Sequence, residues 1–176
     1  MNGTLEQTAS GPRLRFVRHL AHPQDKVWRA ITEPEHLKAW FPDTIEVERW
    51  EVGAPLRFVP APDAAEPFDG AVLAFEPPTL LELRWGTDVI RLELAPEGDG
   101  TRLTLLDTIA ELGKAARDGA GWHVCLDQLE HHLDGTELPW STGDRWRDVH
   151  PSYVEELGPE AATIGPPAGA LDSADG

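Results

Sequence analysis

The chain has 176 residues, of which 40% are hydrophobic, and its 31 acidic and 15 basic side chains give a formal net charge of -16. This composition is typical of one globular domain, and the negative charge disfavours nucleic acid and anionic membranes as partners. A single cysteine excludes an internal disulfide and a multi-thiolate zinc site. Because neither a membrane span nor a secretory signal is recognisable, we expect a cytoplasmic protein.

The N-terminal third combines a polar start, one strand and two short helices. Residues 1–13 are polar and contain glycine and proline, so we expect a disordered lead-in there. The alternation of apolar residues over 14–20 predicts a β-strand. Apolar residues at helical spacing over 24–41 predict two short helices, which Pro34 divides.

The middle of the chain changes to a period of two. Between residues 44 and 109, six apolar or alternating runs are separated by short connections rich in glycine and proline. Together with the first strand they predict about seven strands. Short connections favour antiparallel pairing, so we expect one antiparallel sheet.

One long helical pattern follows, between Gly119 and Gly135. With about 100° of rotation per residue, one face of this helix is apolar. That face consists of Trp122, Cys125, Leu126, Leu129 and Leu133. Residues 136–158 contain enough aromatic side chains to form a packed extension, whereas residues 159–176 have the composition of a disordered acidic tail.

A metal site on the long helix is one hypothesis that the sequence raises. His123, Asp127 and His131 are four residues apart, a spacing that brings side chains together on one helix face. That face lies opposite the apolar one, and no obvious facing ligand is recognisable. We therefore interpret it as solvent-exposed, and we expect no metal ion and no cofactor.

Three segments resemble a known family. VWRAITEPEHLKAWF resembles the helix-pair motif of the SRPBCC (START-like) superfamily, in particular the branch named after the C-terminal domain of activators of the Hsp90 ATPase. GDGTRLTLLDT is similar to the last-strand motif of that branch, and GAGWHVCLDQLEHHLDG is similar to its closing-helix motif. DRWRDVHPSYVEELG resembles an extension found in bacterial members.

The resemblance implies an α+β helix-grip fold over residues 14–135. In this fold a seven-stranded antiparallel sheet wraps around a long C-terminal helix, with two short helices after the first strand. The chain departs from the pattern at residues 53–55, where paired glycines are usual, and at Asp107, where a histidine is common. It also lacks the second domain of eukaryotic chaperone activators, which weakens that functional assignment.

A cavity between the sheet and the long helix is the site that the resemblance favours. The small residues 119–121 leave an entrance beside Trp122 in one interpretation. In the other, the glycines let the backbone approach the sheet, and Asp118 is the helix N-cap. The predicted ligand-binding residues are Trp40, Phe41, Phe58, Phe75, Leu83, Trp85, Leu92, Leu105, Asp107, Trp122, Cys125 and Leu126.

Two polar residues share the inward phase of their strands, Asp107 and Arg18. If both are buried, each must pair with the other, with water or with a ligand; the alternative places them at strand ends near solvent. Cys125 lies on the apolar helix face, and we interpret it as a structural cysteine, not a reactive one.

These features favour non-enzymatic binding of a small hydrophobic or aromatic molecule, and we predict no catalytic residues. One alternative is a cyclase- or hydrolase-like enzyme in which Asp107 and Arg18 assist in the same cavity. The other is an interaction protein similar to a chaperone ATPase activator, docking through its acidic tail with Trp140, Trp146 and Tyr153. Binding to a chaperone and self-association both remain open as partner hypotheses.

Overall fold

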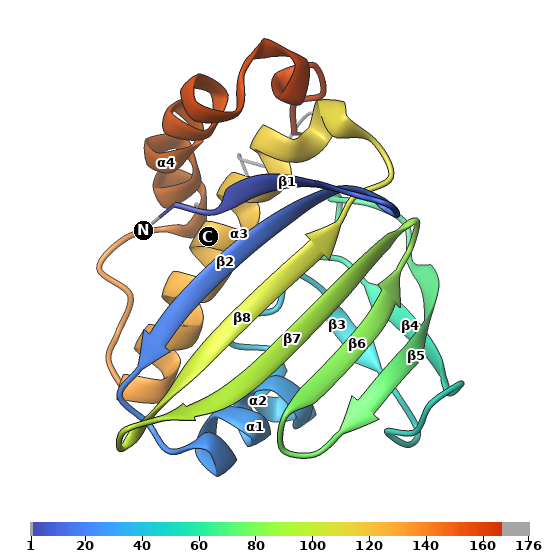
Figure 1. Ribbon diagram of the computed structural model, residues 1–176, viewed down its shortest axis with the longest axis vertical. Coiled ribbons are helices and arrows are strands. Elements are labelled where there is room, and N and C mark those ends of the chain that lie inside the picture. Colours follow the sequence, from blue (N-terminus) through green and yellow to red (C-terminus); the bar gives the residue numbers. More distant parts are fainter. Residues whose placement is uncertain (1, 167–176) are drawn as a thin grey trace.

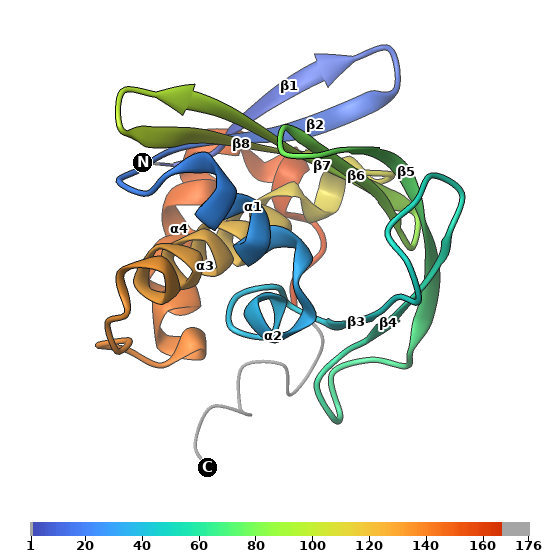
Figure 2. The same ribbon diagram turned by 90° about the horizontal axis from the view of Figure 1, so that it is seen from below.

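In the computed structural model, which describes residues 2–166, one antiparallel sheet curves around a long helix (Figures 1 and 2). The strands are β1 (Thr4–Thr8), β2 (Gly11–Leu20), β3 (Thr44–Glu46), β4 (Pro55–Val59), β5 (Phe68–Glu76), β6 (Leu80–Trp85), β7 (Asp88–Glu97) and β8 (Gly100–Thr108). The helices are α1 (Gln24–Thr32), α2 (Pro34–Leu37), α3 (Ala115–Asp134) and α4 (Thr142–Leu157), with short 3₁₀ helices η1 (Leu112–Lys114) and η2 (Pro159–Ala162). The sheet order is β1-β2-β8-β7-β6-β5-β4-β3.

The α+β helix-grip architecture predicted from the sequence is confirmed, with eight strands instead of seven. The additional strand is β1, which pairs with β2 in the segment predicted to be a disordered lead-in. Because β1 is an edge strand, its residues are half-buried or exposed, and all except Leu5 are polar, so they show no apolar alternation. Hydrogen bonds also hold this end of the chain: the backbone N–H of Gly3 donates to the hydroxyl of Tyr153 in α4 over 2.9 Å.

The apolar face of α3 packs on the concave face of the sheet, as Figure 2 shows. Leu126, Leu129 and Leu133 of this face are all buried, as the helical spacing predicts. They pack in one hydrophobic core with residues of the central strands, such as Leu103 and Leu105 of β8. The main part of the core therefore lies between the sheet and α3, and it continues to Val149 and Tyr153 of α4.

The opposite face of α3 is not solvent-exposed, and this prediction from the sequence is wrong for two of its three residues. The helix α4 packs on that face. His123 is 5% exposed and lies 3.0 Å from the Tyr153 hydroxyl through Nδ1. Burial lowers the pKa of His123 to about 4, so the imidazole is neutral at pH 7. His131 stays near the surface, where its Nδ1 lies 2.8 Å from the hydroxyl of Thr136.

Asp127 joins three elements across this second interface. Its Oδ2 accepts a hydrogen bond from Nε of Arg145 in α4 (2.9 Å), and its Oδ1 accepts one from Nη2 of Arg18 in β2 (3.3 Å). Arg18 also forms an ion pair with Glu130 over 3.0 Å. The side chain of Arg18 is only 8% exposed, so these carboxylates balance a nearly buried positive charge.

The start of α3 and the region beyond α4 differ in detail from the prediction, whereas α3 ends before Gly135 as predicted. The helix begins at Ala115, directly after η1, so Asp118 lies within its first turn and is not the N-cap. Beyond α4, residues 159–162 form η2, and the backbone N–H of Ile164 donates to the carbonyl of Gly113 over 2.9 Å. This part of the predicted disordered tail is therefore ordered, and residues 167–176 lie outside the described residues.

Two glycines of α3 should respond in opposite ways to alanine. A Cβ on Gly119 would lie 2.8 Å from the buried ring of Tyr153, whereas a Cβ on Gly121 would meet no heavy atom within 4 Å. We expect Gly119→Ala to lower the free energy of unfolding by about 1–3 kcal/mol through overpacking. Gly121→Ala should raise it by up to about 1 kcal/mol through helix propensity. Urea unfolding of both variants checks this, and equal effects would contradict the packing of α4.

Asp127→Asn should destabilise the protein, because it leaves Arg18 with one carboxylate fewer in a nearly buried position. We expect a loss of about 2 kcal/mol in the free energy of unfolding, the usual value for a hydrogen bond to a charged group. Glu155→Gln makes the same chemical change at an exposed position of α4 and should stay within about 0.5 kcal/mol of the wild type. Equal urea-unfolding midpoints for the two variants would disprove the role of Asp127.

Candidate functional site

The predicted ligand-binding residues line the interior between the sheet and α3. All of them are buried except Phe75 and Trp85, which are partly exposed. The structure divides their aromatic rings into two groups, one around Trp122 and one around Phe75, and places three carboxylates at the edge of the first group.

The first group is an aromatic cluster that connects the sheet to α3. Phe41 lies at its centre, with its ring centroid 5.6 Å from that of Trp122, 6.2 Å from Phe58 and 6.3 Å from Trp85. The rings of Trp85 and Trp122 are 5.4 Å apart. Phe68, which the sequence prediction omitted, extends the cluster along the sheet through Phe58 and Trp85. Separations of this size are those of favourable aromatic pairs.

Phe75 does not join this cluster, contrary to the single lining predicted. Its ring lies 5.6 Å from that of Trp28 in α1 and 6.2 Å from that of Trp50. The register of β5 shifts between Val72 and Ala74, so that Phe75 faces the same side as Val72 despite an odd spacing. Phe75, Trp28 and Trp50 therefore form a second, separate aromatic group.

Each of the two interpretations of residues 119–121 applies to one glycine: one permits a close approach, and the other faces open space. Gly119 permits a close approach, but to Tyr153 of α4 and not to the sheet. Gly121 is partly exposed, and the space where its Cβ would point contains no heavy atom within 4 Å. The surface of α3 is therefore open at Gly121, the residue before Trp122.

Two buried carboxylates hold the indoles of the aromatic cluster. Nε1 of Trp85 donates to Oδ2 of Asp43 over 2.7 Å, and Nε1 of Trp122 donates to Oδ2 of Asp107 over 2.8 Å. Burial raises the pKa of Asp43, and the hydrogen bond from Trp85 opposes this shift. Sequence analysis missed Asp43 because an aspartate after a proline has the appearance of an ordinary turn residue.

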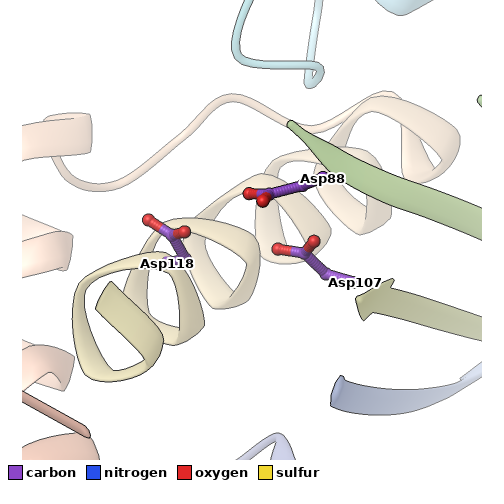
Figure 3. A group of neighbouring side chains, drawn as sticks. All are labelled: Asp88, Asp107 and Asp118. Atoms are coloured by element: carbon purple, nitrogen blue, oxygen red, sulfur yellow. The ribbon is translucent and has the colours of Figure 1, made fainter. Parts of the chain in front are cut away.

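Asp107 is the innermost polar residue, and two further aspartates face it (Figure 3). Asp88 at the start of β7, Asp107 near the end of β8 and Asp118 in α3 each offer a carboxylate oxygen, and these three oxygens lie within 4.8 Å of one another. We call these residues the aspartate triad. Asp88 and Asp107 are buried, and Asp118 is partly exposed.

Neighbouring groups bind most of the triad's oxygens. Asp88 accepts hydrogen bonds from the backbone N–H of Ala110 (2.9 Å) and from Nζ of Lys114 (2.6 Å). Asp118 accepts one from Nε of Arg117 over 2.7 Å. Burial, reinforced by the charges of the other two aspartates, raises the pKa of Asp107 well above its usual value. Its protonated form is therefore favoured inside the protein.

Comparison with known proteins identifies the family of the chain. A family model described as "Activator of Hsp90 ATPase homolog 1-like protein" matches residues 21–134. The chain belongs to this family. No curated protein matches it.

Solved structures share the fold of this activator-like protein. A conserved protein of unknown function from Enterococcus faecalis superposes with a TM-score of 0.72 at 21% identity, covering 88% of this chain and 90% of that one. CalU16 from Micromonospora echinospora gives a TM-score of 0.67 at 22% identity, covering 88% and 95%. A protein from Nitrosomonas europaea gives 0.60 at 27% identity, covering 70% and 94%. These likenesses support the fold and leave the ligand open.

The structure does not pair Arg18 with Asp107, the two residues on which the enzyme hypothesis rests. Arg18 and Asp107 both face inward, but Arg18 pairs with Asp127 and Glu130 on α3. The aspartate triad surrounds Asp107 instead. Burial raises the pKa of Cys125 to about 12, so its thiol is protonated at neutral pH and is not a nucleophile.

The aromatic residues of the proposed docking element are also largely used in packing. Tyr153 is fully buried, and Trp140 and Trp146 are partly buried against the core. Among residues 2–166, no helix is long and apolar enough to cross a membrane.

Asp107→Asn should stabilise the protein at neutral pH. Folding raises the pKa of Asp107. The contribution of this group to the stability of the wild type is therefore fully present only below its unfolded pKa of 3.8. This stability is lost as the pH rises through the folded pKa. Asparagine cannot ionise and can still accept the hydrogen bond from Trp122, so it avoids the loss.

Urea unfolding in buffer with EDTA, at several values between about pH 4 and pH 9, tests this expectation. The difference in free energy of unfolding between Asp107→Asn and the wild type should increase as the pH rises from the acidic end of this range, and then become constant. The exposed Asp99→Asn, in the turn between β7 and β8, removes the same charge and should show no such trend. An advantage of Asp107→Asn that is constant over this range would refute the shifted pKa.

Proposed function

We propose that this protein binds a small hydrophobic or aromatic molecule between its sheet and α3. The observation that carries the proposal is the continuity of the aromatic cluster, which runs from the buried Trp122 and Phe41 to the partly exposed Trp85 and Phe68. A binding site for such a molecule needs mainly apolar walls with a few oriented polar groups. The aromatic rings and the carboxylates of Asp43 and Asp107 are groups of these two kinds.

The position of the open space supports an entry beside the cluster. It adjoins Gly121, the residue before Trp122, whose ring contacts Trp85. A ligand that enters here replaces water on the exposed edge of Trp85 with apolar contact, which is favourable at roughly 25 cal/mol per Å² of apolar surface removed from water. The expected ligand is neutral or cationic, because the net charge of -16 repels anions.

The two alternative functions have less support. The enzyme hypothesis relied on Arg18 beside Asp107, and Arg18 instead binds the carboxylates of α3. The chaperone-activator hypothesis relied on exposed aromatic residues in the extension, and Tyr153 is buried.

Replacing Trp85 should weaken ligand binding. The probe is N-phenylnaphthylamine, a neutral aromatic fluorophore whose emission rises in apolar surroundings. We expect the wild type to bind it saturably and Trp85→Ala to raise the Kd about tenfold, which corresponds to losing about 1.4 kcal/mol of contact. Calorimetric titration provides a readout that does not depend on fluorescence.

The matched control is Trp146→Ala. Trp146 is also a partly buried tryptophan, but it stacks on His150 in α4, away from the cluster. Its replacement should leave the Kd unchanged. Failure of the wild type to bind the probe, or equal weakening by the two variants, would reject an aromatic-binding site at this position.

A further inference from the structure

The aspartate triad combines three hard oxygen ligands at one point of the fold (Figure 3). Its oxygens are no more than 4.8 Å apart. In calcium sites each oxygen lies about 2.3–2.6 Å from the ion, so two oxygens on opposite sides are separated by up to about 5 Å. The three oxygens are thus close enough together for one ion to bind all three aspartates after small side-chain rotations. Asp118 is the partly exposed member and gives access from solvent.

A second observation points to a missing ligand within the triad. Oδ1 of Asp107 is buried and has no hydrogen-bond partner among the described residues, although Oδ2 of the same carboxylate is held by Trp122. Figure 3 shows the Asp107 carboxylate directed toward Asp88 and Asp118. A buried polar atom without a partner costs free energy. A bound cation would provide this oxygen with a partner.

The local charges also favour a cation. Lys114 and Arg117 balance the charges of two carboxylates through ion pairs of 2.6 Å and 2.7 Å. When all three aspartates are ionised, the triad keeps an excess negative charge at its centre. Oδ2 of Asp88, Oδ2 of Asp107 and Oδ1 of Asp118 each accept one hydrogen bond and keep a second acceptor site, because a carboxylate oxygen has two.

We propose that Asp88, Asp107 and Asp118 form a binding site for a hard divalent cation, with Ca²⁺ the best match in size. Oxygen-only ligands select hard ions such as Ca²⁺, Mg²⁺ and Mn²⁺ over zinc and copper, which prefer nitrogen and sulfur. Mg²⁺ requires shorter distances of about 2.0–2.1 Å and releases its water reluctantly, so it should bind more weakly here. The competing explanation is a proton on Asp107, which would donate a hydrogen bond to one of the other two aspartates.

Calorimetric titration of the EDTA-treated full chain with CaCl₂ distinguishes the two explanations. The wild type should bind one Ca²⁺ per chain. Asp107→Asn should weaken this binding at least about tenfold, since it removes a charged ligand. Asp118→Asn should weaken it similarly, and because Asp118 is partly exposed, this variant provides a second test that does not alter the core. Mg²⁺ and Mn²⁺ are titrated separately.

The control for unspecific binding by this acidic protein is Asp99→Asn, which lowers the negative charge equally at an exposed position. It should bind Ca²⁺ as the wild type does. With free Ca²⁺ at about a hundred times the wild-type Kd, the Tm of the wild type and of Asp99→Asn should rise by about 5–10 °C, and that of Asp107→Asn by at most about half as much. Equal Ca²⁺ binding by the wild type and Asp107→Asn, or no binding by the folded wild type, would overturn the proposal.

Discussion

The hydrogen bond from the indole of Trp122 to Asp107 joins α3 to the sheet, and both candidate sites depend on it. On one side of this bond, the ring of Trp122 contacts Phe41 and Trp85 and so holds the aromatic cluster against the helix. On the other side, the same carboxylate faces Asp88 and Asp118, and its Oδ1 has no hydrogen-bond partner among the described residues. A shift of α3 along the sheet would therefore alter the aromatic and the acidic site together.

This arrangement also explains why a carboxylate is tolerated in the core. β8 lies between β2 and β7 near the middle of the sheet, so an inward side chain near its end is covered by α3 and not by solvent. One oxygen of Asp107 obtains a donor from the covering helix, and Lys114 and Arg117 place positive charge on the neighbouring aspartates. The interior is thus mainly apolar, and it has a polar corner where strand ends meet the first turn of α3.

The sequence predicts those parts of the fold in which the local pattern decides the structure. The strands from β3 to β8 alternate or are continuously apolar, and the apolar face of α3 follows a helical period, so both were recognisable. β1 was not, because an edge strand with half-buried polar residues resembles a loop. The packing of α4 on His123 was also missed. Periodicity distinguishes a polar from an apolar helix face, but it does not indicate whether another element packs on the polar face.

The candidate site was predictable to a similar degree. Alternation in β8 gave Asp107 the inward phase but did not decide between the interior and a strand end near solvent, and the apolar phases indicated most of the aromatic cluster. The convergence of Asp88 and Asp118 on Asp107 depends on strand register and on where α3 begins, which are non-local properties. Taken alone, Asp88 has the appearance of a turn residue, and Asp118 that of a helix cap. Their shared role is visible only when three separate elements are placed together.

The bond between Gly3 and Tyr153 has a consequence for how the protein is made. These residues are 150 positions apart in the chain, yet they meet in the layer that covers α3. During synthesis the N-terminal part emerges first, so β1 and the polar face of α3 lack their final neighbours until α4 has left the ribosome. The family match ends at residue 134, before α4 begins. The last helix is therefore the step that closes the molecule, and a nascent chain that stalls before it leaves His123 without its Tyr153 partner.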